Sequence, residues 1–140
     1  MILKNIRYLV TQNSDRQILE NIDLQVTDDR ISGLGRDLSS KGEKVIDCSN
    51  KVVMPGLVNA HTHVSMNLLR GISDDLELDD WLEDVIFPAE EKIDSESAFV
   101  GAKLGCLEML KSGTTCFNDM YDHMYRVADA VEETGMRAVL

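Results

Sequence analysis

The sequence lacks the features that mark several large classes of protein. Its only three cysteines, Cys48, Cys106 and Cys116, form no C-x-x-C pair, so neither a zinc finger nor a disulfide framework is indicated. It has 14 basic against 25 acidic residues, and this net charge of −11 argues against a surface for nucleic acid or anionic membranes. Charged residues interrupt the apolar residues near the amino terminus, so no signal peptide or membrane span is visible. These absences predict a cytoplasmic protein in a reducing compartment.

The sequence does contain enough apolar residues for a packed core. Hydrophobic residues make up 44% of the 140 residues, which predicts one domain or two small ones. The apolar rhythm changes at Pro55-Gly56, so we expect one unit over residues 1–55 and a second over residues 56–140. Up to this boundary, apolar and polar residues alternate as in half-buried antiparallel strands. The expected inward residues are Ile2, Ile6, Tyr8 and Val10 in one run and Ile18, Ile22, Leu24 and Val26 in the next, with Asn21, Asp23 and Gln25 opposite the second set.

Two histidines follow this boundary at a spacing of two residues. The segment 57–63 is mostly apolar, is bounded by Pro55-Gly56, and is typical of a buried strand that ends with His61 and His63. Residues two apart in a strand point to the same side, so both imidazoles should face one pocket. Neutral imidazoles suit a divalent transition metal, although a catalytic zinc site takes three protein ligands and this pair supplies two. Two structural histidines at a strand end are the simpler alternative.

The second unit alternates between strand and helix. We expect strands over residues 57–63, 114–120 and 137–140, and helices over residues 78–92, 95–112 and 122–134. Pro88 should stop or kink the first helix, and the second should be buried around much of its circumference. The alternation predicts parallel βα units of an α/β protein. A closed (β/α)8 barrel takes roughly 250 residues, so we expect this chain to be the amino-terminal piece of a longer enzyme.

The run Pro55-Gly56-Leu57-Val58-Asn59-Ala60-His61-Thr62-His63 resembles a motif of the amidohydrolase superfamily. The resemblance implies the first βα units of a (β/α)8 barrel, incomplete in this chain and preceded by part of a small β-sandwich. It also implies that His61 and His63 are ligands of one metal ion per subunit, zinc or alternatively iron or manganese. The family's other ligands, two histidines and an aspartate, and the glutamate that protonates the ring come from later strands, so no catalytic residue is expected within this chain.

A narrower resemblance rests on four further segments. Leu68-Leu69-Arg70-Gly71, Asp80-Trp81-Leu82, Pro88-Ala89-Glu90 and residues 111–121 resemble the aminohydrolase and chlorohydrolase branch, above all the 5-methylthioadenosine/S-adenosylhomocysteine deaminases. This implies that Glu90 binds the ribose hydroxyls and that Trp81 lies near the substrate. The implied reaction is attack by metal-activated hydroxide on the carbon that bears the exocyclic amine, with release of ammonia. The implied partner is a small purine nucleoside, with neither nucleic acid nor membrane, and a homo-oligomer stays open.

Other interpretations of these residues compete with the enzymatic one. The parent could be a guanine- or triazine-type aminohydrolase or chlorohydrolase, and the 140-residue chain alone could be an inactive fragment. Glu90 could be a solvated acid, and Trp81 could pack on an amphipathic helix. We further expect Arg70 to pair with a nearby acid. Asp119 is a candidate for a hydrogen bond behind the site, and His123 is expected in a loop or at the surface.

Overall fold

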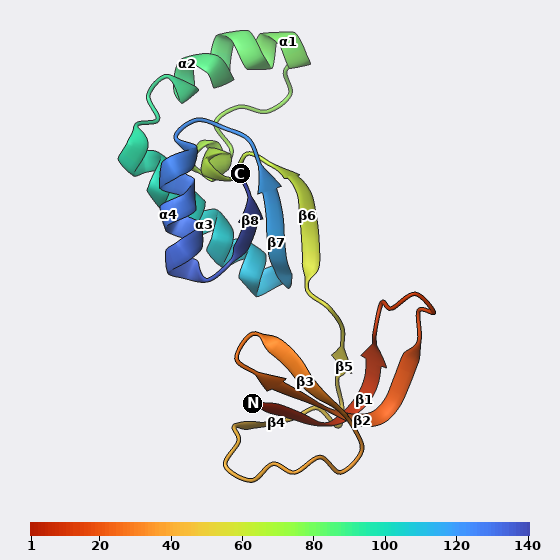
Figure 1. The fold of residues 1–140 in the computed structure, drawn as a ribbon. Helices are drawn as coiled ribbons and strands as arrows, with labels where there is room; N and C mark the ends of the chain where they lie inside the picture. The colour runs from red at the N-terminus through yellow and green to blue at the C-terminus, as the bar shows by residue number, and fades with distance from the viewer. The chain divides into compact units, whose positions relative to one another are not determined.

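The computed structural model describes residues 1–140 as two compact units, Met1–Pro55 and Gly56–Leu140 (Figure 1). The first unit is all β and the second combines helices with a parallel sheet. None of the helices is long and apolar enough to cross a membrane.

The first unit is a single sheet built around β1. Its strands are β1 (Ile2–Val10), β2 (Ile18–Thr27), β3 (Arg30–Gly35), β4 (Val45–Asp47) and β5 (Val52–Val53). The order is β3-β2-β1-β4, and β5 also pairs with β1. The pairs β1–β2 and β2–β3 are antiparallel, which confirms the pairing expected for the first two runs, whereas β4 and β5 run parallel to β1.

The inward face of the first unit differs in part from the predicted one. Ile6 and Leu24 are buried as expected, but Leu9 is buried in place of Tyr8, which is 36% exposed. Asn5 has a positive φ, and the pairing with β2 shifts register between Leu3 and Ile6. Such a bulge bends and twists a strand, so the strict alternation assumed from the sequence does not hold.

Asp23 is a second exception, because it is buried although its neighbours suggested a polar face. Lys4 Nζ donates to Asp23 Oδ2 at 2.6 Å, and the backbone amides of Asn5 and Leu38 donate to the same carboxylate at 2.8 and 3.0 Å. Burial raises the pKa of Asp23, but these hydrogen bonds outweigh it, so the pKa lies below its ordinary value. A buried carboxylate is tolerated here because three donors are directed at its oxygens.

The second unit has a three-stranded parallel sheet in the order β6-β7-β8, as the alternation predicts. Its strands are β6 (Leu57–Thr62), β7 (Thr114–Asp119) and β8 (Arg137–Val139). Its helices are η1 (Val64–Leu69), α1 (Leu78–Asp80), η2 (Trp81–Ile86), α2 (Phe87–Glu90), α3 (Ser95–Ser112) and α4 (Met124–Thr134). In Figure 1, α3 and α4 lie together beside the sheet.

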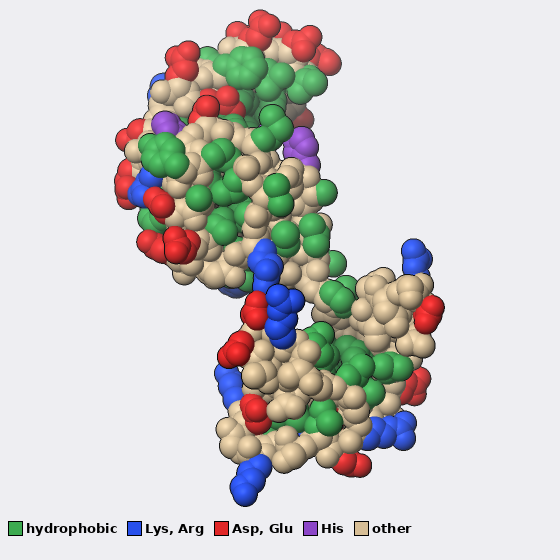
Figure 2. Space-filling view, in the orientation of Figure 1, with side chains coloured by type: hydrophobic (Ala, Val, Ile, Leu, Met, Phe, Trp, Pro, Cys, Tyr) green, Lys and Arg blue, Asp and Glu red, His purple; other side chains and the backbone are tan.

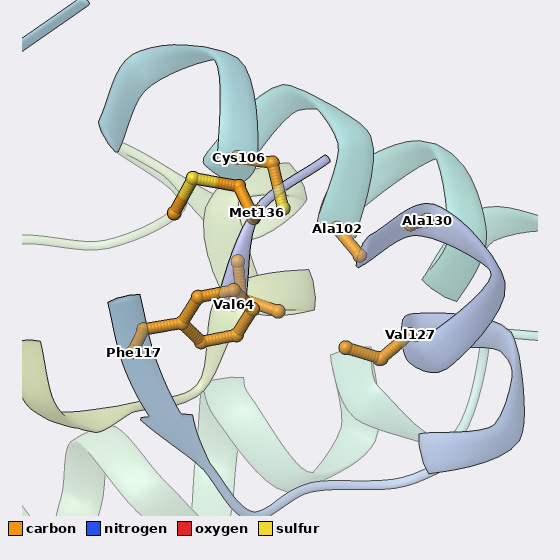
Figure 3. Packing of buried hydrophobic residues seen from close by; sticks show 7 residues of the cluster. All are labelled: Val64, Ala102, Cys106, Phe117, Val127, Ala130 and Met136. Atoms are coloured by element: carbon orange, nitrogen blue, oxygen red, sulfur yellow. The ribbon is translucent and has the colours of Figure 1, made fainter. Parts of the chain in front are cut away.

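The core of the second unit forms where α3 and α4 meet the sheet. Figure 3 shows the buried set, which is Val64, Ala102, Cys106, Phe117, Val127, Ala130 and Met136. Phe117 is the largest of these side chains and is fully buried, so β7 is the strand around which this core is built. The carboxyl ends of β6 and β7 are thereby fixed next to each other.

Helix α3 has the predicted bounds because both of its ends carry a cap. The side chain of Asp94 accepts a hydrogen bond from the amide of Ser97 at 2.8 Å, and Gly113 has φ 90°, the left-handed conformation of a helix end. The prediction of burial around the helix is wrong on one side, because Val100 and Leu107 are 51% and 53% exposed. The prediction of a buried strand at 57–63 is likewise wrong, since β6 lies at a sheet edge.

Of the two effects expected of Pro88, a stop is not seen, because helix continues over residues 78–90. The segment is not a regular α-helix, since the π-helical turn η2 directly precedes α2, the element that contains Pro88. Figure 2 shows acidic side chains gathered over this segment, which carries Asp79, Asp80, Glu83 and Asp84 in its first turns.

Candidate functional site

The two histidines predicted to share a face do converge. His61 is on β6 and His63 follows directly after it, and their Nε2 atoms are 3.3 Å apart. The ring centroids are 5.0 Å apart and the rings are nearly perpendicular, at 84°. Two nitrogen ligands of a tetrahedral zinc ion, each at about 2.0–2.1 Å, are separated by about 3.3–3.4 Å. The spacing of the pair therefore fits one shared metal ion.

A backbone carbonyl fixes the protonation pattern of His63. Nδ1 of His63 lies 2.7 Å from the carbonyl oxygen of Met120, just after β7. A carbonyl can only accept, so Nδ1 carries the proton and the lone pair of the neutral ring is on Nε2, the atom that faces His61. Histidines that bind metals characteristically donate their other ring N–H in this way. The arrangement is thus suited to metal binding through Nε2.

Asp119 holds the backbone just after the pair. It ends β7, is 3% exposed, and its two carboxylate oxygens lie 3.3 and 3.4 Å from the amide nitrogen of Val64, which donates to them. Burial raises the pKa of Asp119 above its ordinary value, although hydrogen bonds oppose the shift. Asp119 therefore holds the backbone directly after His63, and the two side chains also interact electrostatically. A role for Asp119 behind a metal site stays a prediction.

Glu90 is brought to the same place by the helical segment that precedes α3. Tyr121, which follows β7, donates its hydroxyl to Glu90 Oε1 at 2.6 Å. The ring of Tyr121 lies 5.6 Å from that of His63. Burial, followed by the neighbouring Glu90, raises the pKa of Tyr121 well above its ordinary value, so the phenol remains a donor at neutral pH. A cavity of about 490 Å³ is lined by His63, Glu90, Asp119 and Tyr121 together with Met120, Asp122, Met124 and Leu140.

Other candidates lie outside this cavity. Trp81 is half-buried on η2 and is not among the lining residues. Arg70 forms a bidentate salt bridge with Glu108, with hydrogen bonds of 2.9 and 2.6 Å, which confirms the expected pairing with an acidic residue. This salt bridge links the end of η1 to α3. His123 lies in the turn before α4, one of its two expected places, and is half-buried there. Its Nε2 lies 3.1 Å from the carbonyl oxygen of Ile93.

The chain places two potential metal ligands together but no more. No group of three or more His, Cys, Asp or Glu side chains is arranged to hold a metal ion. The sequence analysis assigns no role to Tyr121. The available signal is its position just after the carboxyl end of the second parallel strand, because active sites in barrels form on that side.

The comparisons with known proteins agree with this arrangement. Residues 52–140 match the amidohydrolase family. The chain is 48% identical over 140 residues to a 5'-deoxyadenosine deaminase of Methanosarcina barkeri, covering all of this chain and 32% of the relative. It is 46% identical over 136 residues to a 5-methylthioadenosine/S-adenosylhomocysteine deaminase of Desulforamulus reducens, covering 94% of this chain and 31% of the relative.

A solved structure extends the likeness to the fold. The crystal structure of an adenosine deaminase from Xanthomonas campestris with bound zinc has a TM-score of 0.83 and 32% identity, and the match covers 99% of this chain and 32% of that one. The chain spans about a third of the length of the curated relatives it matches. On the match over residues 52–140, this chain belongs to the amidohydrolase family.

Proposed function

We propose that this chain is the amino-terminal part of a metal-dependent deaminase of 5'-modified adenosines, such as 5'-deoxyadenosine or 5-methylthioadenosine. The observation that carries the proposal is the convergence of His61 Nε2 and His63 Nε2 at 3.3 Å, beside a cavity shared with Glu90. The names of the relatives supply the substrate class. In this view residues 1–55 contribute to a β-sandwich, and residues 56–140 supply the first βα units of a (β/α)8 barrel.

His61 and His63 would hold the metal through their Nε2 atoms, with the remaining ligands on later strands. Zinc is the preferred ion, because neutral imidazoles suit it and a structural relative contains it. A bound zinc ion supplies Lewis acidity that makes water a nucleophile near neutral pH. The hydrogen bond from His63 Nδ1 to Met120 keeps the ring oriented, and Asp119 fixes the backbone that follows it. With only two ligands, the 140-residue chain alone should bind zinc weakly and release no ammonia.

Glu90 would select the nucleoside. A carboxylate can accept hydrogen bonds from two vicinal ribose hydroxyls, and Glu90 reaches the cavity that His63 also lines. Its carboxylate has one hydrogen-bond partner, Tyr121, which leaves acceptor capacity for a substrate. Trp81 would approach the ligand from η2, where an indole could stack on the purine.

The alternative is a related hydrolase that acts on a free base or a triazine. Such substrates have no ribose, so Glu90 would lack the vicinal hydroxyls from which it accepts in a nucleoside. The metal-loaded complete protein should be tested for ammonia release from 5'-deoxyadenosine, 5-methylthioadenosine, S-adenosylhomocysteine, guanine and an aminotriazine. We expect turnover of the nucleosides alone. Faster turnover of guanine or the triazine would reject the proposal.

A further inference from the structure

Tyr121 contacts both parts of the proposed site, the metal-binding His63 and the substrate-binding Glu90. Its hydroxyl donates to Glu90 Oε1 at 2.6 Å, and its ring lies 5.6 Å from that of His63, tilted by 40°. The preceding residue, Met120, also belongs to the site, because its carbonyl accepts a hydrogen bond from His63 Nδ1 at 2.7 Å. Two consecutive residues after β7 therefore touch the metal-side histidine and the substrate-side carboxylate.

The same loop holds the segment that carries Glu90 at a second point. His123 has a left-handed backbone conformation, with φ 55°, and its Nε2 lies 3.1 Å from the carbonyl oxygen of Ile93. Ile93 is also linked to Glu90 through its own amide, which donates to the Glu90 carbonyl at 2.9 Å. The loop of residues 120–123 thus contacts the end of α2 and the turn after it through two side chains, Tyr121 to the Glu90 carboxylate and His123 to the Ile93 carbonyl.

The chemistry of the Tyr121–Glu90 contact is directional. A carboxylate is an acceptor only, so the phenol is the donor and occupies one position on Oε1. No other hydrogen bond is made by the Glu90 side chain, so its carboxylate keeps acceptor capacity for a ligand in the cavity that Glu90 lines. A free glutamate side chain loses rotamer freedom on binding a ligand, and a hydrogen bond that orients it beforehand reduces that loss.

We propose that Tyr121 is a positioning residue that orients Glu90 for vicinal hydroxyls of the substrate, and so sets the preference for ribose-bearing ligands. This inference rests on the proposed function. Tyr121 does not contact the reacting carbon in this account. It acts through Glu90, and its effect should therefore be seen in KM and depend on the hydroxyls of the substrate.

The test compares Tyr121→Phe with the parent in the complete, zinc-loaded protein. Phenylalanine keeps the ring that packs beside His63 and removes only the donor. We expect KM for 5'-deoxyadenosine to rise about tenfold, as for a hydrogen bond to a charged group, with kcat within about twofold. KM for an analogue that lacks the 2'- and 3'-hydroxyls should not change. Tyr125→Phe is the matched control. Tyr125 is a nearby tyrosine in the first turn of α4 that is 63% exposed and does not line the cavity, so its variant should match the parent.

Two further measurements separate this role from a purely structural one. Adding Tyr121→Phe to Glu90→Ala should produce no additional rise in KM, because the residue to be oriented is gone. Zinc content should equal that of the parent. An equal rise in KM for the analogue without hydroxyls, an additive effect in the double variant, or a loss of zinc would overturn the proposal. Failure of the proposed function is distinguishable, because the parent itself would then not deaminate the nucleoside.

Discussion

His63 Nδ1 lies 2.7 Å from the carbonyl oxygen of Met120, so a side chain just after β6 is bonded to the backbone just after β7. The two strands are parallel neighbours, and their carboxyl ends therefore meet at one edge of the sheet. This single contact places the Nε2 lone pair of His63 towards His61 and brings Tyr121, the next residue, beside both His63 and Glu90. The local fold thus organises the proposed metal and substrate positions together.

Glu90→Gln should weaken the binding of nucleosides by the complete protein if the proposed function holds. The amide keeps the shape of the side chain but loses the negative charge and one acceptor, so charge-assisted hydrogen bonds to ribose hydroxyls are lost. We expect KM for 5'-deoxyadenosine to rise about tenfold or more, measured by steady-state ammonia release. Glu91→Gln, at the adjacent exposed residue, is the control and should leave KM as it is. An unchanged KM in Glu90→Gln would count against a substrate contact.

Gly105→Ala should destabilise the second unit and disturb the histidine pair. A Cβ at Gly105 would lie 2.4 Å from Val64 Cγ2 and 2.5 Å from Asn67 Nδ2, and Val64 directly follows His63. Alanine improves helix propensity by about 1 kcal/mol, but the overlap forces η1 to move, and we expect a net loss of about 1–2 kcal/mol. Urea denaturation of the 140-residue chain measures this change.

The control for this substitution is Leu107→Ala, two residues further along α3 at a position that is 53% exposed. Its free energy of unfolding should change by less than about 1 kcal/mol. If Gly105→Ala were as stable as the parent, the close approach of η1 to α3 would not be a constraint on the fold.

Asp23→Asn should remove a pH-dependent part of the stability of the first unit. The folded-state pKa of Asp23 is below its ordinary value of 3.8, because the hydrogen bonds from Lys4, Asn5 and Leu38 outweigh the effect of burial. The contribution of the carboxylate is therefore complete above pH 3.8 and is lost as the pH falls through the lowered pKa. At pH 7 the variant leaves Lys4 without its partner charge and should be less stable by about 3 kcal/mol.

The measurement is the urea concentration at the unfolding midpoint of parent and variant, at pH values from about 2.5 to about 7. This range includes the pH at which aspartate titrates. The difference between the two proteins should shrink as the pH falls below 3.8. Asp15→Asn, an exposed loop position, should follow the parent throughout. A difference between Asp23→Asn and the parent that stays constant with pH would show that the charge of Asp23 is not responsible.

The predictable parts of the fold are those decided by local chemistry. Asp94 and Gly113 mark the ends of α3 in sequence, and the spacing of His61 and His63 places them on one side of a strand. Tyr8 was assigned to the core because strict alternation was assumed, but the backbone of Asn5 and the register shift beside it depend on pairing with β2. Local patterns cannot specify such long-range contacts.

The same distinction applies to the candidate site. The contact between Tyr121 and Glu90 joins residues 31 positions apart and forms only when the helical segment and the loop after β7 pack together. Pro88 predicts either a stop or a kink, and only the folded structure shows that helix continues past it after the π-helical turn η2. Exposed apolar residues on α3 and β6 were predicted to be buried from hydrophobicity alone, which carries no information about which surface covers them.

The most direct test of the central claim is zinc-dependent deamination by the complete protein with and without its histidine pair. Ammonia release from 5'-deoxyadenosine should be measured for the parent and for His61→Ala and His63→Ala, with zinc content determined in each sample. Asp15→Ala serves as the control, because Asp15 is an exposed turn residue of the first unit. The account predicts turnover by the parent and by Asp15→Ala, and loss of both zinc and activity by at least about 100-fold in either pair variant. Full activity and zinc content in His61→Ala or His63→Ala would contradict it.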